Sequence, residues 1–529
     1  MTTAKVLITD KLSETAVQIF KDRGLDVTFD PTLGKDPERL LRVIGEYDGL
    51  AVRSATKVTS KVIAAADRLK VIGRAGIGVD NIDVKAATAK GIIVMNTPSG
   101  NSVTTAEHAL SMMMALARQI PQANASTHAG KWEKSKFLGV ELFNKTLGVI
   151  GCGNIGAIVA DRAIGLKMRV IAYDPFLTED RAVALGVEKV ELDALLTRAD
   201  FISLHVPLTD KTRNILSAEA LAKTKSSVRI INCARGGLID EEALASALRA
   251  GHIAGAALDV FEQEPATDHP LFLFDNVICT PHLGASTGEA QEKVALQIAE
   301  QMSDHLLKGA ITNAINFPSI TPEEAPRLMP YVTLAEQLGS FAGQLTDVAI
   351  KGVRLEYCGE AAGLNVKPLT AAALGGLLRP SMPDVNMVSA AHNAAQRGIA
   401  VEEMTCSQHD VYESFVKLTV KTNSYERSVA GTISVDGRPR FIQVRDIDMD
   451  FALSEHMLFV RNQDKPGFIG NFGTLMGENG VNIATFNLGR ETPGGEAVTV
   501  VALDDAVSDE VLKQVSQLKH VVRARRLRF

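Results

Sequence analysis

The sequence predicts an α/β protein in which two doubly wound parallel units are followed by two smaller α+β units. Three observations support this prediction. Short β-branched runs alternate with amphipathic segments up to about residue 310, a glycine-rich loop lies between a strand-like and a helix-like run, and the order of elements changes near residue 456. Strands that alternate with helices are typical of parallel sheets covered by helices. A chain of 529 residues is long enough for three or four such domains.

The first unit occupies about the first hundred residues. Amphipathic runs predict helices, and a further long helix at 101–118, capped by Ser102 or Thr104, leads out of this unit. The strands are expected at 6–8, 27–29, 49–52, 71–73 and 92–95, and the helices at 13–23, 37–47 and 60–66.

The second unit opens with the glycine loop G-C-G-N-I-G at residues 151–156. Gly151 permits a tight turn, Gly153 lets the backbone approach a pyrophosphate, and Gly156 lets the helix pack on the strand. Asp174 ends the next strand, where a carboxylate accepts hydrogen bonds from both ribose hydroxyls and repels a 2′-phosphate. The loop therefore predicts dinucleotide binding, with NAD favoured over NADP.

The remaining strands of this unit are expected at 146–150, 169–173, 201–204, 229–232, 255–258 and 277–279. A helix at 289–308 is expected to return the chain to the first unit. We therefore expect a discontinuous substrate-binding domain at 1–99 and 285–317, an NAD-binding Rossmann domain at 100–284, and the site in a cleft between these lobes.

Four prolines predict a boundary after the second unit. We expect an intervening α+β domain at 318–455, with helices at 332–345, 369–378 and 385–398 and strands at 415–422, 428–435 and 440–444. Its Arg438 and Arg440 are candidates for anion binding, although a solvated basic turn is the simpler interpretation. Residues 456–529 follow the order strand, helix, strand, strand, helix, strand, which is typical of a ferredoxin-like domain.

Three segments of the second unit carry candidate catalytic side chains: 232–237 (N-C-A-R-G-G), 259–265 (D-V-F-E-Q-E-P) and 280–287 (T-P-H-L-G-A-S-T). Each follows a predicted strand, so each is expected at the carboxyl edge of the sheet. A histidine can exchange a proton near neutral pH, a carboxylate beside it fixes its tautomer, and an arginine can hold a substrate carboxylate. This set suits hydride transfer at a hydroxy-acid carbon, although spacing alone leaves Glu262 and Glu264 as alternatives.

Composition argues against several other classes. The net charge of −6 and the pI near 6.1 give no indication of nucleic-acid or membrane binding. The five cysteines are scattered without C-x-x-C spacing, so we expect no disulfide framework, no metal site and a cytoplasmic protein.

These motifs, together with residues 73–83 (G-R-A-G-I-G-V-D-N-I-D), resemble those of the D-isomer-specific 2-hydroxyacid dehydrogenases, and among them the long-form D-3-phosphoglycerate dehydrogenases. The resemblance covers residues 5–529. It implies that Arg235 orients the substrate, that Glu264 is the partner of the histidine, and that His282 is the general acid/base. It places the cofactor contacts at Gly151, Gly153, Asn154, Ile155, Gly156, Asp174, Val206, Cys233, Ala234, Arg235, Asp259, His282, Leu283, Gly284 and Ala285.

Substrate contacts are expected from the first unit, because two groups of polar residues follow predicted strands there. Backbone N–H groups around Ser54 and in Gly76, Ile77 and Gly78 are candidates for the substrate carboxylate, and Arg53 and Arg74 are candidates for a phosphate. The resemblance adds Lys131, from a region that packs on a second subunit in this family.

The last domain resembles an ACT domain, which in this family often binds serine between two copies. Asp464 and Asn482 match the ligand-holding positions, and Asn462 stands where a His or Tyr is usual, which puts serine affinity in question.

The resemblance implies a homotetramer that uses NAD to oxidise 3-phospho-D-glycerate to 3-phosphohydroxypyruvate, the first step of serine synthesis, under feedback by serine. Two alternatives remain. One is a dehydrogenase for another D-2-hydroxy acid, such as glycerate or 2-hydroxyglutarate, and the other is a non-enzymatic NAD-sensing partner protein.

Overall fold

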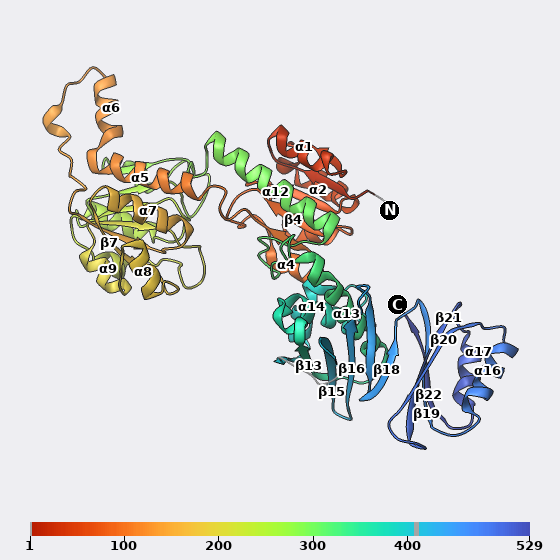
Figure 1. Ribbon diagram of the computed structural model, residues 1–529. Helices are drawn as coiled ribbons and strands as arrows, with labels where there is room; N and C mark the ends of the chain where they lie inside the picture. The colour runs from red at the N-terminus through yellow and green to blue at the C-terminus, as the bar shows by residue number, and fades with distance from the viewer. Residues whose placement is uncertain (1–2, 407–411) are drawn as a thin grey trace.

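The structure is a computed structural model that describes residues 3–406 and 412–529. It contains four β-sheets, two of them fully parallel, so the predicted α/β class is confirmed. Figure 1 shows the four parts in sequence order from red to blue. Short 3₁₀ helices lie at Leu33–Lys35, Ile44–Glu46, Lys134–Lys136, Pro270–Leu273 and Gly359–Gly363.

The first lobe is a five-stranded parallel sheet in the order β2-β1-β3-β4-β5. The long helix α12 (Gly288–Lys308) returns from the second lobe and packs against α1, β3, β4 and β5, as Figure 1 shows. The other elements are β1 (Lys5–Ile8), α1 (Glu14–Asp22), β2 (Asp26–Phe29), α2 (Pro37–Val43), β3 (Gly49–Val52), α3 (Ser60–Ala65), β4 (Val71–Arg74), α4 (Val84–Lys90) and β5 (Ile93–Met95).

The second lobe is a seven-stranded parallel sheet in the order β12-β11-β10-β9-β6-β7-β8. The chain enters it through α5 (Ser102–Arg118), whose N-cap is Asn101; neither Ser102 nor Thr104 caps it, so that expectation was wrong. The other elements are α6 (Ile120–His128), β6 (Thr146–Ile150), α7 (Asn154–Gly165), β7 (Arg169–Tyr173), α8 (Glu179–Leu185), β8 (Glu188–Lys189), α9 (Leu192–Arg198), β9 (Phe201–Leu204), α10 (Ala218–Ala222), β10 (Arg229–Asn232), α11 (Glu241–Arg249), β11 (Gly255–Leu258) and β12 (Val277–Cys279).

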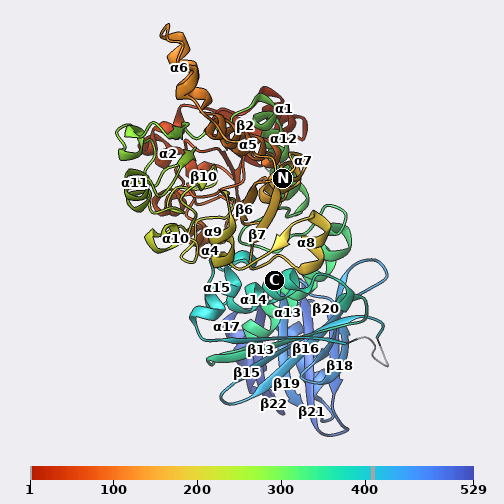
Figure 2. The ribbon, with the colours of Figure 1, turned by 90° about the vertical axis from the view of Figure 1, so that its left-hand side faces the viewer.

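An arm that carries α6 projects away from this lobe, and Figures 1 and 2 both show it standing clear of the rest of the chain. Trp132 and Leu138, which follow α6, are 87% and 85% exposed. Large apolar side chains at such exposure indicate a surface that another molecule covers.

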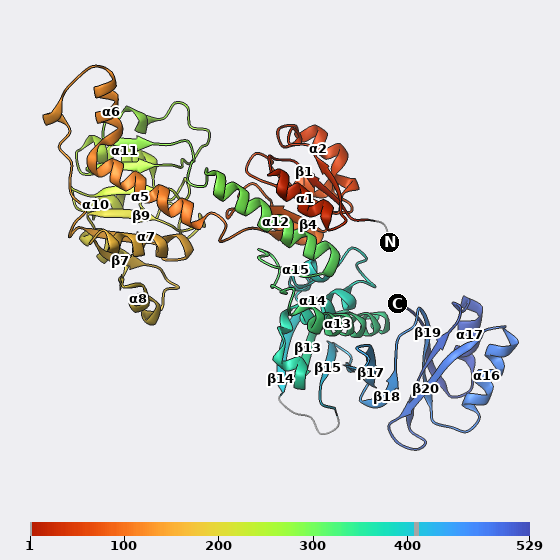
Figure 3. The ribbon, with the colours of Figure 1, turned by 45° about the horizontal axis from the view of Figure 1, so that its top comes forward.

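The third domain has a six-stranded sheet in the order β14-β13-β15-β16-β17-β18, with α13 and α14 packed together and α13 also against β15, β16 and β17. Its α15 lies against α4 of the first lobe, where the Asn386 side chain donates to the Gly91 carbonyl at 2.8 Å (Figure 3). The elements are α13 (Ala325–Leu345), β13 (Ile350–Cys358), α14 (Val366–Leu378), α15 (Met387–Gln396), β14 (Ala400–Cys406), β15 (Phe415–Thr422), β16 (Glu426–Ile433), β17 (Pro439–Val444) and β18 (Ile447–Phe451).

Two sequence expectations fail in this domain. Pro326 and Pro330 do not mark a boundary but lie within α13, the first in its opening turn, where a missing N–H is tolerated. Cys358 and Cys406 form a disulfide although none was expected. The reason is the register, because these residues pair directly across the parallel strands β13 and β14 with 4.7 Å between their Cα atoms. Sequence spacing gives no sign of this contact.

The C-terminal domain has the predicted order of elements: β19 (His456–Gln463), α16 (Phe468–Glu478), β20 (Ile483–Arg490), β21 (Glu496–Leu503), α17 (Asp509–Gln517) and β22 (Val521–Arg528). Its antiparallel sheet has the order β20-β21-β19-β22.

The hydrophobic cores divide the molecule differently from the sheets. One buried cluster runs from the first lobe through Phe317 and α13 to the C-terminal sheet at Met457 and Val498. The second lobe has its own clusters on the two faces of its sheet. The first lobe and the two C-terminal domains therefore share a core, while the second lobe is packed as a separate body.

Candidate active site

The glycine loop lies between β6 and α7, and packing explains two of its three glycines. Gly151 has a φ of +90°, and a Cβ there would lie 2.7 Å from the His205 carbonyl oxygen. A Cβ on Gly156 would lie 2.0 Å from the Gly151 oxygen. A Cβ on Gly153, in contrast, would have no atom within 4 Å. Gly153 therefore borders open space at the N-terminus of α7, where Asn154 and Ile155 begin the helix.

Asp174 is held beside this loop by two backbone groups. Its two carboxylate oxygens accept hydrogen bonds from the Cys152 and Phe176 N–H groups, each at 2.8 Å. Because each oxygen has two lone pairs, one acceptor position on each remains for a ribose hydroxyl. The carboxylate is thus fixed in orientation before a nucleotide arrives.

The three candidate catalytic segments meet at one edge of the second sheet, because β10, β11 and β12 are parallel neighbours in register. Arg235 follows β10, and Asp259 and His282 follow β11 and β12. The Asn232 side chain shapes the first turn by accepting from the Ala234 N–H at 3.0 Å and donating to the Arg235 carbonyl at 2.8 Å. The same edge receives Val206, which follows β9.

His282 and Glu264 form a hydrogen bond of 2.7 Å between Nδ1 and Oε2. The hydrogen bond that His282 donates to Glu264 raises the pKa of His282 despite partial burial. Burial alone would raise the pKa of Glu264, but the hydrogen bonds from His282 and the Phe261 N–H outweigh it and lower that pKa. Glu262 instead lies 3.5 Å from Arg213. Because Nδ1 carries a hydrogen bonded to Glu264, Nε2 is the nitrogen left to exchange a proton with a substrate.

Asp259 is fully buried and organises the backbone next to His282. Its carboxylate accepts from the N–H groups of Leu283 and Gly284 at 2.7 and 2.8 Å and from the Thr280 hydroxyl at 2.5 Å. Its backbone carbonyl accepts from the His282 N–H at 2.9 Å. His282 itself has a φ of +57°, an uncommon conformation for a residue other than glycine.

Arg235 connects the two lobes. Its Nε donates to Asp80 at 2.9 Å, and its Nη1 donates to the Ala234 carbonyl at 2.6 Å. A Cβ on Gly78 would lie 1.7 Å from Nη2 of Arg235, so Gly78 provides the space for the guanidinium. The first lobe is therefore brought against the arginine predicted to orient the substrate, and Asp80 is a residue that sequence reasoning missed.

Arg74 and Arg53, the two candidates for a phosphate, differ in their surroundings. Burial, Arg235 and Arg53 lower the pKa of Arg74 to about 10, although Asp80 and Asp10 oppose the shift. The Nε of Arg74 is buried and has no hydrogen-bond partner within residues 3–406 and 412–529. Arg53 instead turns toward the Lys11 carbonyl at 3.2 Å. Arg74 is thus the one of the two with a buried guanidinium nitrogen that has no partner in the described part of the chain.

The backbone donors expected around these arginines are only partly available. The Gly76 N–H donates to the Thr97 hydroxyl at 2.8 Å and is already used. The N–H groups of Ser54, Ile77 and Gly78 donate to no acceptor in the described part of the chain. Lys131 follows α6 (Ile120–His128) on the projecting arm, and Figures 1 and 2 show that arm standing clear of the rest of the chain.

The three regulatory candidates of the C-terminal domain do not converge. Asn462 is buried, and its side-chain oxygen accepts a hydrogen bond from the Thr499 hydroxyl. Asp464 binds Arg490 and the Gly494 N–H, whereas Asn482 donates to Asp504 at 2.6 Å. These positions lie at opposite ends of β21, which spans about 23 Å at about 3.3 Å per residue.

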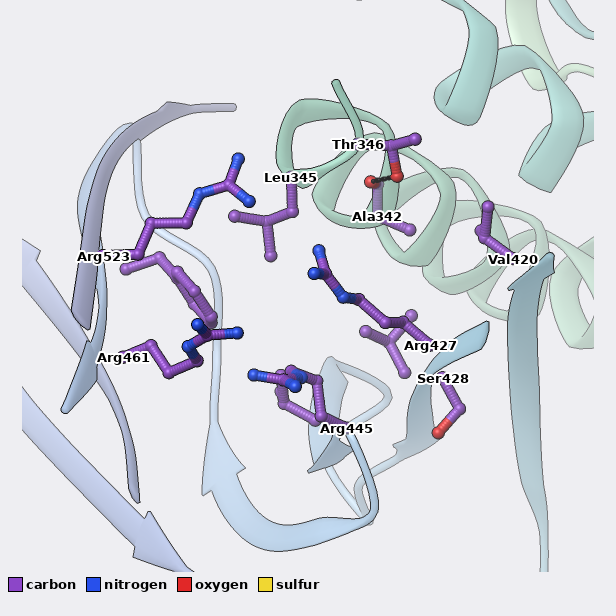
Figure 4. Close-up of a pocket in the computed structure, with 12 residues that line it drawn as sticks. Ala342, Leu345, Thr346, Val420, Arg427, Ser428, Arg445, Arg461 and Arg523 are labelled. Carbon is purple, nitrogen blue, oxygen red and sulfur yellow. Dashed lines mark hydrogen bonds between the residues drawn. The ribbon is translucent and has the colours of Figure 1, made fainter. Parts of the chain in front are cut away.

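A pocket between the third and C-terminal domains gathers arginines that sequence reasoning also missed. Figure 4 shows Arg427 and Arg445 of the third domain facing Arg461 and Arg523 of the C-terminal domain, below Leu345 at the end of α13. Arg438 and Arg440, the earlier candidates, pair instead with Asp436 and Asp450.

The carboxylates around this pocket do not balance its arginines. Glu496 pairs with Arg445 and Arg461, and Asp347 pairs with Arg523 and Arg525. Arg427 has no carboxylate; it stacks on Tyr425, and its Nε has no hydrogen-bond partner among the described residues. Burial lowers the pKa of Arg427, and Arg445, Arg523 and Arg461 lower it further.

Family models match three parts of the chain: the NAD binding domain of D-isomer specific 2-hydroxyacid dehydrogenases at 110–284, the intervening domain of D-3-phosphoglycerate dehydrogenase at 327–445, and the ACT domain at 456–520. The chain is 44% identical to a D-3-phosphoglycerate dehydrogenase of Synechocystis sp. over 525 residues, which cover 98% of this chain and 93% of that one. It is 42% identical to one of Archaeoglobus fulgidus over 524 residues, which cover 98% and 99%.

Solved structures resemble the two N-terminal lobes. A glyoxylate reductase from Paecilomyes thermophila has a TM-score of 0.56 and 30% identity over 61% of this chain and all of that one. A D-lactate dehydrogenase from Aquifex aeolicus, complexed with NAD and lactic acid, has a TM-score of 0.53 and 28% identity over 60% of this chain and all of that one. In the described part of this chain, no helix is long and apolar enough to cross a membrane.

Proposed function

This chain belongs to the D-3-phosphoglycerate dehydrogenases of the D-isomer specific 2-hydroxyacid dehydrogenase family, and we propose that it oxidises 3-phospho-D-glycerate to 3-phosphohydroxypyruvate with NAD, the first step of L-serine biosynthesis. The observation that carries this conclusion is the His282–Glu264 hydrogen bond, which lies at the same sheet edge as Arg235 in a domain that opens with a dinucleotide loop.

The residues of the second lobe fit NAD. The open space at Gly153 leaves room for a pyrophosphate against the N-terminus of α7, and Asp174 has acceptor positions for two ribose hydroxyls. Its negative charge would repel a 2′-phosphate, which favours NAD over NADP. When bound, NAD takes up the hydride that leaves carbon 2 of the substrate.

His282 acts as the general base in this direction. Neutral Nε2 accepts the proton of the substrate hydroxyl, and Glu264 stabilises the imidazolium through Nδ1–H. Arg235 holds the substrate carboxylate and the oxygen that becomes a carbonyl, and it exchanges its contact with Asp80 for these anionic groups. In the reverse reaction, protonated His282 returns the proton to that oxygen.

We assign the phosphate of the substrate to the first lobe, which also offers backbone donors to the carboxylate that Arg235 holds. Arg74 has a buried Nε without a partner, and the Ile77 and Gly78 N–H groups beside it are free to donate. Arg53, in contrast, already uses Nη1 to donate to the Lys11 carbonyl. Arg74 is therefore the phosphate ligand that we favour.

The test follows NADH absorbance with phosphohydroxypyruvate and with unphosphorylated hydroxypyruvate. We expect turnover of the phosphorylated substrate that falls by about three orders of magnitude in His282→Ala. Arg74→Gln should lose most of the preference for the phosphorylated substrate with little change toward hydroxypyruvate. Turnover of hydroxypyruvate alone would indicate a dehydrogenase for another hydroxy acid. NADH binding without turnover of either would favour a non-enzymatic NAD-sensing protein.

Regulation by serine is a further proposal, supported by the match to the ACT domain. Because Asp464 and Asn482 lie at opposite ends of one sheet, a serine site needs Asp464 of one copy beside Asn482 of another, in an antiparallel pair of domains. Inhibition by serine that is lost in Asp464→Ala or Asn482→Ala, but not in Asn462→Ala, would support this arrangement. We propose a homotetramer in which the projecting arm with Lys131 reaches a neighbouring subunit.

For the third domain we propose that the arginine pocket of Figure 4 binds a small multivalent oxyanion. The support is its excess of arginines and the Arg427 guanidinium without a carboxylate. A cytoplasmic location remains a prediction from cysteine usage, and the Cys358–Cys406 pair weakens that basis.

A further inference from the structure

Helix α5, through which the chain enters the second lobe, places a histidine against the catalytic edge. The His108 Nε2 lies 3.2 Å from Asp259 Oδ1 and 3.3 Å from the Thr280 hydroxyl oxygen. Thr105 and Met112 lie on the same face of α5, at spacings of three and four residues from His108. Thr105 lies beside Gly284, and Met112 Sδ lies 3.9 Å from the Thr280 hydroxyl.

The hydrogen-bond roles in this cluster are fixed by its chemistry. The Thr280 hydroxyl donates to Asp259 at 2.5 Å, so its oxygen can only accept from His108. Both neighbours of Nε2 are therefore acceptors, and Nε2 must carry a hydrogen. His108 thus contributes a donor to a carboxylate that is fully buried.

Asp259 depends on such donors. Burial raises the pKa of Asp259, but the hydrogen bonds from His108, Thr280 and the Leu283 N–H outweigh it and keep the pKa below its usual value. A buried carboxylate that loses a hydrogen-bond donor pays a desolvation cost that is no longer offset, and its remaining hydrogen bonds then hold the neighbouring backbone less firmly. What Asp259 orders is the backbone on both sides of His282, through the Leu283 and Gly284 N–H groups and the His282 N–H.

We propose that His108 is a positioning residue for hydride transfer: by binding Asp259, it holds the Leu283–Gly284 backbone and thereby sets His282 in its working position. The left-handed backbone of His282 gives this restraint its importance, because that conformation persists only where the surroundings impose it. His108 touches neither the reacting histidine nor Glu264, so it acts through Asp259. The inference rests on the proposed dehydrogenase function for its kinetic consequences.

The experiment compares His108→Leu, which removes the donor, with His108→Gln, whose amide retains one at similar reach. His108→Asn, whose amide is too short to reach Asp259, serves as a second variant if the leucine protein does not fold. Ser111→Ala is the matched control, because Ser111 is an exposed residue of the same helix that binds only the Glu107 carbonyl. All four are assayed with NADH and phosphohydroxypyruvate, and thermal unfolding reports whether the fold is intact.

We expect His108→Leu to lower kcat by about 10- to 100-fold, the loss typical of one hydrogen bond to a charged group, with a much smaller change in KM. His108→Gln should restore most of the activity, and Ser111→Ala should match the wild type. Unchanged kcat in His108→Leu would overturn the proposal. Equal losses in the leucine and glutamine variants would also overturn it, because packing rather than hydrogen bonding would then be responsible.

A second readout does not need activity. Amide hydrogen exchange of the peptide that contains Leu283 and Gly284 should be faster in His108→Leu than in the wild type and unchanged in His108→Gln. Equal exchange in all proteins would refute the positioning role. If the wild type fails to reduce phosphohydroxypyruvate, the proposed function fails, while the exchange rates still decide whether His108 holds the loop.

Discussion

Replacement of Gly153 by alanine should weaken NAD binding without affecting the fold. The added Cβ would have no atom within 4 Å in the ligand-free chain, and Gly153 has a negative φ of −75° that alanine adopts. The methyl group would occupy the open space that we assign to the pyrophosphate. The Gly153→Ala substitution therefore tests NAD binding separately from the stability of the fold.

The magnitude follows from the hydrogen bonds at stake. A methyl group between the loop and the pyrophosphate displaces at least one charge-assisted hydrogen bond from a backbone N–H, which is worth about 1.5–3 kcal/mol. The dissociation constant for NADH should rise by about 10- to 100-fold. The free energy of unfolding without cofactor should change by less than about 0.5 kcal/mol, as at surface positions.

Two glycines of the same region provide controls. Gly165→Ala, at the end of α7, also adds a Cβ with no atom within 4 Å but lies at the opposite end of the helix from Gly153, so NADH affinity should not change. Gly156→Ala would place its Cβ 2.0 Å from the Gly151 oxygen and should lower both stability and affinity. The assays are NADH fluorescence titration and thermal unfolding. NADH affinity of Gly153→Ala within twofold of the wild type would show that the pyrophosphate does not lie over this loop.

Three further predictions follow from the contacts described above. Glu264→Gln removes the negative charge of the hydrogen-bond acceptor that raises the pKa of His282, so that pKa falls; because protonated His282 serves the reduction, its pH–rate profile should lose activity at a lower pH than that of the wild type, and an unshifted profile would exclude Glu264 as the partner. Cys358→Ser removes a disulfide with a sequence separation of 48 residues and should lower the free energy of unfolding of the third domain by about 4 kcal/mol, as measured by denaturant unfolding. A reducing agent should lower the stability of the wild type by a similar amount and should leave the stability of Cys358→Ser unchanged. Phosphate should raise the melting temperature of the wild type more than that of Arg427→Met, which retains only the phosphate site at Arg74; equal shifts in both proteins would contradict the anion pocket.

Much of the fold was predictable because the parallel strands are short buried runs between turn signals. The strand at 415–422 was predicted with its observed bounds, and the strands expected in both lobes match within one residue, although the two-residue strand β8 and the third-domain strand β18 were not predicted. The strands β13 and β14 were missed, because Ile350–Cys358 and Ala400–Cys406 carry charged residues and β14 is almost entirely exposed. The prolines of α13 also misled, because Pro326 lies in the first turn, where no helix hydrogen bond is lost, and the buried face of the helix offsets the one that Pro330 removes.

The candidate catalytic edge was predictable because it depends only on topology. In a parallel sheet every strand delivers the residue after its end to the same edge, so Arg235, Asp259 and His282 could be placed together from sequence. His108, Asp80 and the arginine pocket depend instead on which faces of separate elements meet. The hydrophobic pattern of the sequence does not predict that His108 of α5 faces Asp259, or that Asp80 of the first lobe contacts Arg235.

These unpredicted contacts also connect the proposed catalytic groups to the segments that join the lobes. The second lobe has its own cores and is joined to the rest of the chain through the segments that lead into α5 and α12. One of these segments leads directly into α5, the helix that carries His108 against Asp259. Because Asp259 in turn holds the backbone next to His282, α5 contributes both to the connection between the lobes and to the position of the proposed general base.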